Sequence, residues 1–442
     1  MKIQLGEHFT YKKLLRFTLP SIAMMVFMSI YGVVDGFFVS NFAGEQPFTA
    51  VNFIYPFIMV LTAVGFMFGS GGSALIAKTQ GEGDLKKANR LFSLFVYTIC
   101  AAGVVLSILG IIFIRPIALW MGASEGMLGY CIIYGRIILA ALPLSMLQYA
   151  FQTFFSTAEK PNLGFVVTLI AGGMNMLLDA LFVAVFKWGV AGAAVATAFS
   201  QAVGGILPLI YFSRKNGSVL RLGKTNIDMA ALAKASSNGM SEFLSNVASS
   251  VVGMLYNVQL MKYAGEQGVA AYGVLMYVCF IFYAIFIGYS MGSAPIVGYH
   301  YGAQNREEVK SVLRKSLWLA FITSAVMTAL CIVLAKPLAL LFVGYNPALV
   351  KLTTRAFIFY AFVFVFVGVG IFGSGFFTAL NNGLVSAIIS FLRVLVFQIA
   401  AVLLFPLIWE TDGIWLSVVF AEFASTVLVA IFLLANKKKY GY

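Results

Sequence analysis

The chain consists largely of apolar runs that are long enough to cross a membrane. Leu91 to Ile114 contain no charged side chain, and Leu163 to Phe186 contain a single one. As a helix, each run covers the roughly 30 Å of hydrocarbon in a bilayer. Hydrophobic residues make up 61% of the chain and charged residues 10%, whereas about a quarter of a soluble domain is charged. The sequence therefore predicts an all-α integral membrane protein.

Short polar segments divide the chain into twelve such spans. The spans begin near positions 14, 50, 91, 128, 163, 189, 235, 270, 316, 352, 384 and 413. Residues 1–16 are polar and basic and lack the small-residue cleavage site of a secretory signal, so we expect the first span to be retained. All four cysteines fall in apolar runs, which favours packing over a disulfide framework or a zinc site; they are Cys100, Cys131, Cys279 and Cys331.

The basic residues indicate which way the spans point. If the first segment is cytoplasmic, the 29 Lys and Arg divide into 21 on the cytoplasmic side, two inside spans and six outside. Such an excess marks the cytoplasmic face, so we predict a multi-pass protein of the inner (plasma) membrane with both termini in the cytoplasm. The net charge of +13 is spread over short segments, which argues against nucleic-acid binding. The six outer residues are Arg115, Lys187, Lys262, Lys336, Lys351 and Arg355.

The second half of the chain repeats the first. The tetrapeptide AGEQ occurs at 43–46 and again at 264–267, which is 221 residues later, and at the same offset RPIAL at 115–119 meets KPLAL at 336–340. Six spans separate the copies, so corresponding helices point the same way. Parallel repeats are related by an axis along the membrane normal, with the substrate path between them. We therefore predict two six-helix lobes related by a pseudo-two-fold, namely residues 1–213 and 235–442, joined by a cytoplasmic linker at 214–234.

Four oxygen-bearing residues share one depth in the first lobe. Counted from the outer ends of their spans, Asp35, Asp179 and Thr197 lie roughly 9 to 12 Å below the surface, and Asn175 is one helical turn before Asp179 on the same face. An intramembrane carboxylate usually faces an aqueous cavity or a partner. The set offers oxygen ligands to a hard cation such as Na⁺. Alternatively, two close carboxylates carry a proton, or Tyr31 simply hydrogen-bonds to Asp35.

The repeat shows that this cluster belongs to one lobe only. At an offset of 221, the four residues meet apolar or aromatic side chains, so a lobe folds without them. This asymmetry favours a function over a structural role. The aligned residues are Tyr256, Val396, Ala400 and Val418.

The second lobe has ionisable residues of its own inside spans. Glu242 in span 7 and Arg393 in span 11 are predicted to form a pair, with Glu422 of span 12 as the competing partner. This polar set is open to both a structural and a transport role. In span 1, Pro20 removes a backbone hydrogen bond and can bend the helix that carries Asp35, so we expect it to act as a hinge.

The motifs resemble those of bacterial multidrug and toxic compound extrusion (MATE) transporters. They are YGVVD at 31–35, NMLLD at 175–179 and GVAGAAVATAFSQ at 189–201, within twelve spans in two halves. The resemblance implies a monomeric antiporter, without a cofactor, that exports organic cations or amphiphiles in exchange for Na⁺ or H⁺. It implies that Asp35, Asn175, Asp179 and Thr197 form the cation or proton site. Span 10 lacks the acid found in another branch of the family, which argues against a cation site in the second lobe.

Two other functions compete with this interpretation. A flippase for lipid-linked saccharides would need several cavity Arg or Lys for a pyrophosphate, and only Arg136 and Arg393 are available. A membrane enzyme would need clustered acids or paired His, but His8 and His300 are isolated. We therefore expect a transporter and not an enzyme.

Overall fold

A computed structural model describes residues 3–442, and the described part is helical without β-strands. The first half contains α1 (Tyr11–Phe38), α2 (Glu45–Gly81), α3 (Leu85–Trp120), α4 (Glu125–Ala140), α5 (Leu142–Thr157), α6 (Pro161–Asp179) and α7 (Gly189–Ser213). The second half contains α8 (Met229–Gly302), α9 (Arg306–Val343), α10 (Pro347–Ala361), α11 (Val363–Ala379), α12 (Gly383–Phe391), α13 (Gln398–Leu404) and α14 (Pro406–Tyr440). Three short π-helical segments are η1 (Val39–Ala43), η2 (Ala180–Val185) and η3 (Leu392–Phe397).

These elements make the twelve predicted spans. The pairs α4–α5 and α10–α11 are single spans bent by 59° and 46°. The 74 residues of α8 would be about 110 Å long as one rod, but the helix breaks at Gly265, where φ is 62° and ψ is −157°. Glycine adopts a positive φ at little cost, so α8 reverses there and crosses the membrane twice. Most helices begin a few residues before the predicted span, because polar end residues continue the helix beyond the hydrocarbon.

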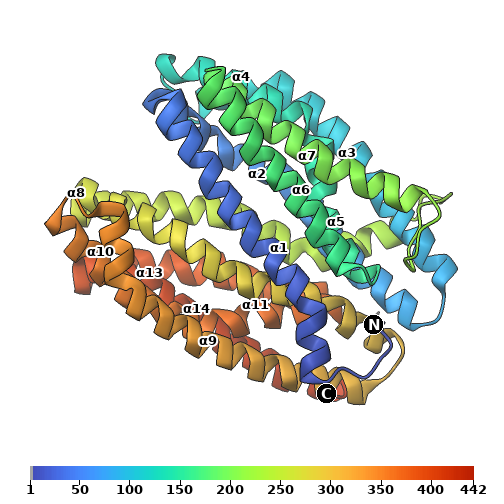
Figure 1. Cartoon of the computed structure of the whole chain (residues 1–442). Coiled ribbons are helices and arrows are strands. Elements are labelled where there is room, and N and C mark those ends of the chain that lie inside the picture. Colours follow the sequence, from blue (N-terminus) through green and yellow to red (C-terminus); the bar gives the residue numbers. More distant parts are fainter. Residues whose placement is uncertain (1–2) are drawn as a thin grey trace.

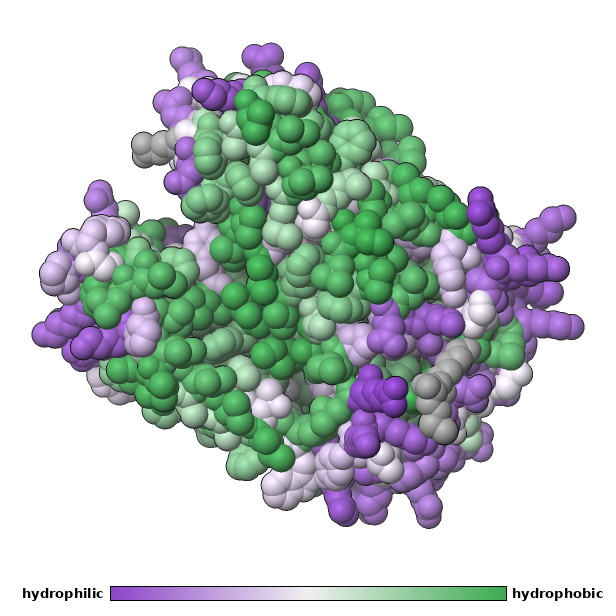
Figure 2. All heavy atoms as spheres, in the orientation of Figure 1, coloured by the Kyte–Doolittle hydropathy of each residue, from purple (hydrophilic) through white to green (hydrophobic). Residues whose placement is uncertain are grey.

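The helices form two bundles that meet at one end and separate at the other. In Figure 1, α1–α7 lie above α8–α14, and the bundles converge on the right, where both termini lie. We call this the terminal end, and we call the opposite end, which carries Gly44 and Gly265, the open end. Figure 2 shows a notch between the bundles at the open end and an apolar belt between two hydrophilic ends. The twelve-helix, two-lobed membrane architecture predicted from the sequence is confirmed.

The connection between the lobes is shorter than the predicted linker. Residues 214–228 are not helical, and α8 begins at Met229 with Asp228 as its N-cap, because the Asp228 side chain accepts a hydrogen bond from the Ala231 backbone N–H. The segment folds back on the first lobe: the backbone N–H of Gly223 donates to Ser93 Oγ at 3.0 Å.

Turns with positive φ repeat along the chain and give the register of the two halves. Gly44 and Gly265 are 221 residues apart, as are Gly83 and Gln304. The later pairs, Glu159 with Asn381 and Lys187 with Glu410, are 222 and 223 apart. The second copy has therefore gained one residue before span 5 and another before span 6, so a constant offset of 221 is wrong for those two spans.

Glycines let the two lobes approach each other closely at the terminal end. A Cβ on Gly81 would overlap the Tyr299 backbone, and a Cβ on Gly302 would overlap the Lys78 backbone. Each residue of this contact lies 221 positions from its counterpart, so the pseudo-two-fold axis passes between α2 and the end of α8. Farther from the end, Gly239 similarly abuts the Met67 backbone. Only residues without a side chain allow this approach.

The segment before α1 (residues 3–10) bridges the two lobes at the same end. The Leu5 N–H donates to Glu159 Oε1 at 2.9 Å in the first lobe, and the Phe9 N–H donates to Glu308 Oε1 at 2.9 Å in the second. The side chains of Leu5 and Phe9 are buried. This N-terminal segment therefore lies across the closed junction and contacts both sides of it.

Candidate functional site

The candidate site lies where three helices of the first lobe meet near the open end. Asp35 is in the last turn of α1, just before η1, and Asp179 is the last residue of α6, just before η2. Thr197 is in α7, which packs against α6. Helices that change from α to π geometry frequently do so at functional sites, and both carboxylates stand at such a change.

The two carboxyl groups lie close together, and no donor among residues 3–442 hydrogen-bonds to their buried oxygens. Asp35 and Asp179 are close enough for their side chains to share a hydrogen bond if one of them carries a proton. Asp35 Oδ1 and both oxygens of Asp179 are buried without a partner, and the whole Asp179 residue is 0% exposed. A buried ionised carboxylate without a partner is strongly destabilised. The pair therefore needs a proton or a cation.

Asn175 and Thr197 complete the oxygen cluster. Asn175 Nδ2 donates to Thr197 Oγ1 at 3.4 Å, which joins α6 to α7. The amide oxygen of Asn175 is buried without a partner, and the residue is 1% exposed. All four side chains predicted for the site are thus in the same region, with unsatisfied oxygens of the type that bind Na⁺. The described residues contain no group of three His, Cys, Asp or Glu suited to a metal ion.

Tyrosines surround the carboxylates, and the sequence indicated only one of them. Tyr31 is near Asp35, with its ring against Gly172 of α6, but the described part of the chain contains no hydrogen bond between Tyr31 and Asp35. The interpretation of Asp35 as an acceptor satisfied by Tyr31 is therefore wrong in this conformation. Tyr55 and Tyr134 also interact electrostatically with Asp35. Nothing in the sequence distinguished these two from the other tyrosines.

The corresponding place in the second lobe is closed by neutral groups. Tyr256, the counterpart of Asp35, is 2% exposed, and its hydroxyl is 2.6 Å from Ser417 Oγ. Ser417 in turn donates to the backbone oxygen of Ile414, so Tyr256 is the donor in the first bond. The ring of Tyr256 stacks on Tyr272 at 5.5 Å. The hydroxyls of Tyr256 and Ser417 therefore both have partners, unlike the carboxylate oxygens in the first lobe.

The corrected register does not change the asymmetry between lobes. With an offset of 222 at the start of span 5, Asn175 is opposite Phe397 and Asp179 is opposite Ala401. With an offset of 223 at the start of span 6, Thr197 is opposite Phe420. The residues named at a constant offset (Val396, Ala400 and Val418) are thus replaced, but the second copy again offers no oxygen ligand.

In the second lobe, Arg393 pairs with Glu422. Its Nε lies 2.9 Å and 3.0 Å from the two carboxylate oxygens of Glu422, which is 1% exposed. Glu242 is close enough to interact electrostatically with Arg393 but forms no ion pair with it within the described residues. The sequence allowed two partners for Arg393. The predicted pair with Glu242 is not formed among the described residues, and the competing pair with Glu422 is.

Pro20 lies inside α1, where it is buried. The helix continues from Tyr11 to Phe38 around it. Because proline has no N–H, the carbonyl of Arg16 lacks its intrahelical bond. Next to it, Ser21 Oγ is 3.1 Å from Ser156 Oγ of α5.

Known proteins are similar to this chain in sequence and in fold. The profile of the MatE family matches residues 20–181 and again residues 243–404, so one family unit occurs twice. The multidrug export protein MepA of Staphylococcus haemolyticus is 27% identical over 330 residues, covering 74% of this chain and 71% of that protein. The MepA protein of Staphylococcus saprophyticus is 24% identical over 73% of this chain and 71% of its own length.

One solved structure shows the same fold over almost the whole chain. An outward-facing multidrug resistance MATE family transporter of the MOP superfamily superposes with a TM-score of 0.93 at 21% identity, covering 98% of this chain and 97% of that one. The family profile covers most of the chain in two copies, and the resemblance drawn from the sequence motifs is confirmed. This chain is a multi-span membrane protein that belongs to the MatE family of multidrug export transporters.

Proposed function

We propose that this protein exports organic cations or amphiphiles by antiport, and that the cluster of Asp35, Asn175, Asp179 and Thr197 binds the coupling cation. The two lobes, residues 1–213 and 235–442, alternate between two states. In one state the lobes are separated at the open end, and in the other they are separated at the terminal end. The protein acts as a monomer in the plasma membrane with both termini in the cytoplasm. The observation that carries the proposal is the group of buried carboxylate oxygens without donors in the first lobe.

The charge of the cluster explains how coupling would work. When a cation leaves, two facing carboxylates remain in a region of low dielectric, which is unfavourable. A second cation, or a cationic substrate between the lobes, relieves this charge. Antiport follows, because the lobe reorients readily only when the carboxylates are neutralised. Both H⁺ and Na⁺ satisfy this requirement.

The flippase alternative gains no support from the second lobe. Recognition of a pyrophosphate requires free cations in the cavity, but the charge of Arg393 is neutralised by Glu422 at 2.9 Å. Arg136, the other basic residue within a span, is exposed on α4. Export of cationic or amphipathic compounds is therefore the function that we propose.

Reconstituted protein can test the proposal and identify the ion. Ethidium transport in proteoliposomes is measured with an imposed pH gradient alone, with a Na⁺ gradient alone and with neither. We expect one of the two gradients to raise the rate of ethidium transport at least tenfold above the rate measured without a gradient. We expect Asp35→Asn and Asp179→Asn to lose that stimulation. Stimulated transport by both variants at the wild-type rate would contradict the role of the cluster.

A matched variant controls for the loss of a negative charge. Glu125 is an exposed acid in the first turn of α4, so Glu125→Gln removes one charge outside the site. We expect it to transport like the wild type under both gradients. If Glu125→Gln fails in the same way as Asp35→Asn, the effect would be on total charge or on reconstitution, and the cluster would have no special role.

A further inference from the structure

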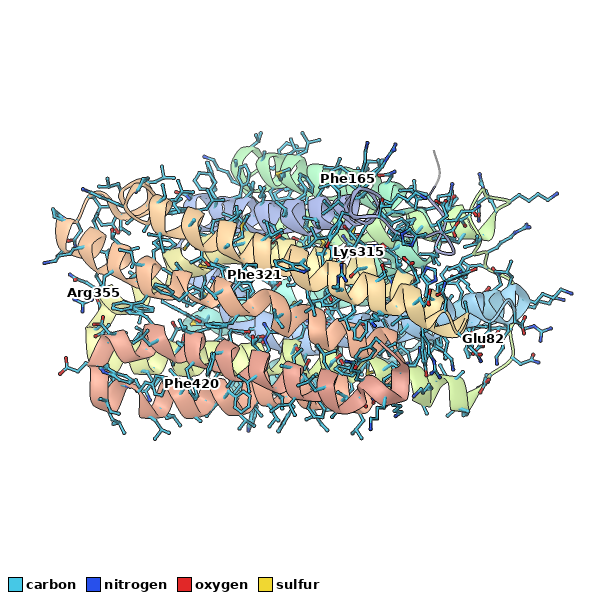
Figure 3. The ribbon with its side chains drawn as sticks, turned by 90° about the horizontal axis from the view of Figure 1, so that it is seen from below. Glu82, Phe165, Lys315, Phe321, Arg355 and Phe420 are labelled. Carbon is cyan, nitrogen blue, oxygen red and sulfur yellow. The ribbon has the colours of Figure 1, made fainter. Side chains whose placement is uncertain are left out.

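A groove of about 470 Å³ lies on the second lobe at the open end, between α9 and α10. In Figure 3, Arg355 marks this end of the molecule and Glu82 the opposite end. The groove has basic residues and apolar walls, and none of its residues belongs to the candidate cation site. The residues that matter for its chemistry are Lys336, Lys351, Thr354, Arg355, Ile358 and Phe359.

The groove concentrates positive charge where the protein otherwise has little. Three of the six basic residues assigned to the outer side line it. Arg355 pairs with Asp412 and stacks on Phe359, with its Cζ 5.7 Å from the ring centroid. Lys336 and Lys351, by contrast, form no ion pair within residues 3–442. Two cations therefore remain available to a ligand.

The groove also contains a hydroxyl group without a partner. Thr354 Oγ1 is buried and makes no hydrogen bond with the residues that the structure describes. Leaving a buried hydroxyl without a partner costs free energy. A ligand with an acceptor oxygen would remove this cost, so the hydroxyl and the two lysines favour the same kind of group.

The other lobe lacks this arrangement. At an offset of 221, Lys336 corresponds to Arg115, but Lys351 and Arg355 correspond to Tyr130 and Tyr134. Tyr134 is buried beside the candidate cation site. The twelve-helix fold therefore does not require three basic residues at this position.

We propose that the groove is a binding site for an anionic phospholipid of the leaflet at the open end. The lipid phosphate lies between Lys336 and Lys351, and Thr354 donates a hydrogen bond to it once its side chain has rotated about χ1 to turn the hydroxyl into the groove. An acyl chain runs along Ile358 and Phe359 toward the middle of the membrane. A lipid suits the groove better than a soluble anion, because the walls beside the cations are apolar and include the exposed side chain of Ile358.

Native mass spectrometry of purified protein with added lipid tests the site. Wild-type protein is titrated with phosphatidylglycerol and, separately, with zwitterionic phosphatidylcholine. We expect one phosphatidylglycerol to bind roughly 30-fold more tightly to the wild type than to the double variant Lys336→Gln/Lys351→Gln, since each basic residue near an anionic lipid contributes about 1 kcal/mol. Binding of phosphatidylcholine should be the same in both proteins.

Two further variants make the result specific to the groove. Arg115→Gln/Lys187→Gln removes two outer basic residues elsewhere and should bind phosphatidylglycerol as tightly as the wild type. Lys336→Arg/Lys351→Arg keeps the positive charge of the groove and should retain most of the affinity. Excess inorganic phosphate should leave the lipid bound. Equal loss in both Gln variants would show general charge attraction and overturn the site, as would displacement of the lipid by phosphate alone.

Discussion

Asp35 and Tyr256 occupy equivalent positions in the two lobes, and their hydrogen bonding is opposite. The hydroxyl of Tyr256 donates to Ser417 at 2.6 Å, whereas Oδ1 of Asp35 is buried without a partner. The Tyr256 position has a satisfied hydrogen bond, and the Asp35 position has a buried oxygen with no partner among the described residues. We infer from this difference that the same place in a duplicated fold serves two different roles.

Substitutions at these two positions should have opposite effects. Tyr256→Phe removes a buried hydrogen bond, so we expect it to lower the free energy of unfolding by about 1 kcal/mol and to leave ethidium transport intact. Asp35→Asn should abolish gradient-driven transport and leave stability equal or higher, since it removes an unpaired buried charge. Thermal unfolding in detergent and transport in proteoliposomes, measured on the same preparations, would show both effects. If the Tyr256→Phe variant were as stable as the wild type but no longer transported ethidium, Tyr256 would have a role in transport and not in stability.

The ion pair between Arg393 and Glu422 should behave as a closed unit. Removing one partner of a buried pair typically costs 3 to 5 kcal/mol, so we expect Glu422→Gln to lower the melting temperature strongly. The charge swap Arg393→Glu/Glu422→Arg should recover part of the loss. The swap Arg393→Glu/Glu242→Arg should not recover it, and recovery there would identify Glu242 as the functional partner.

Closure of the terminal end should depend on Gly81 and Gly302. Alanine at either position would place a methyl group against the opposite backbone, at a cost of about 1 to 3 kcal/mol in the closed state only. We expect Gly81→Ala and Gly302→Ala to shift the population toward a separated terminal end by similar amounts, because the contact is symmetric. Pulsed electron spin resonance between labels at the exposed residues Lys86 and Lys310 would measure the separation.

A glycine with free space around it is the control for that experiment. A Cβ on Gly253 would meet no atom within 4 Å. We expect Gly253→Ala to keep the distance distribution of the wild type. A shift as large as that of Gly81→Ala would mean that lower backbone flexibility, and not steric contact at the junction, controls the equilibrium.

Pro20 should affect the rate of transport more than assembly. Alanine restores the N–H that the Arg16 carbonyl lacks and makes α1 harder to bend at this turn. We therefore expect Pro20→Ala to slow ethidium turnover several-fold, while the amount of protein in the membrane is unchanged. Turnover at the wild-type rate, measured at equal protein in proteoliposomes, would exclude a hinge at this position.

Hydropathy and the repeat were sufficient to predict the spans and the lobes. Burial in lipid requires long apolar helices, so their number follows from the sequence. The internal repeat then places spans relative to one another. Equal depth was enough to bring Asp35, Asp179 and Thr197 together, because depth and helical face are both fixed by residue spacing.

Contacts that depend on side-chain orientation could not be predicted in this way. Glu242 and Glu422 were both possible partners for Arg393, since residue spacing does not define a rotamer. Tyr55 and Tyr134, which lie near Asp35, come from other helices and look like ordinary apolar residues in the sequence. The register of spans 5 and 6 shifted by one and two residues. The first shift is visible in the sequence, where FFSTA at 154–158 meets FFTAL at 376–380. The second could not be predicted, because one extra residue between Asn381 and Glu410 leaves the hydropathy pattern unchanged.

The N-terminal segment limits how far the terminal end can open. Only four peptide units separate its attachment to the first lobe at Leu5 from its attachment to the second at Phe9. A fully extended chain covers about 3.5 Å per residue, so these two points can move no more than roughly 14 Å apart while both bonds hold. The segment is therefore a tether of fixed length between the lobes. Any wider opening must break the hydrogen bond to Glu159 or the one to Glu308, and each cycle of such opening would break and re-form that bond.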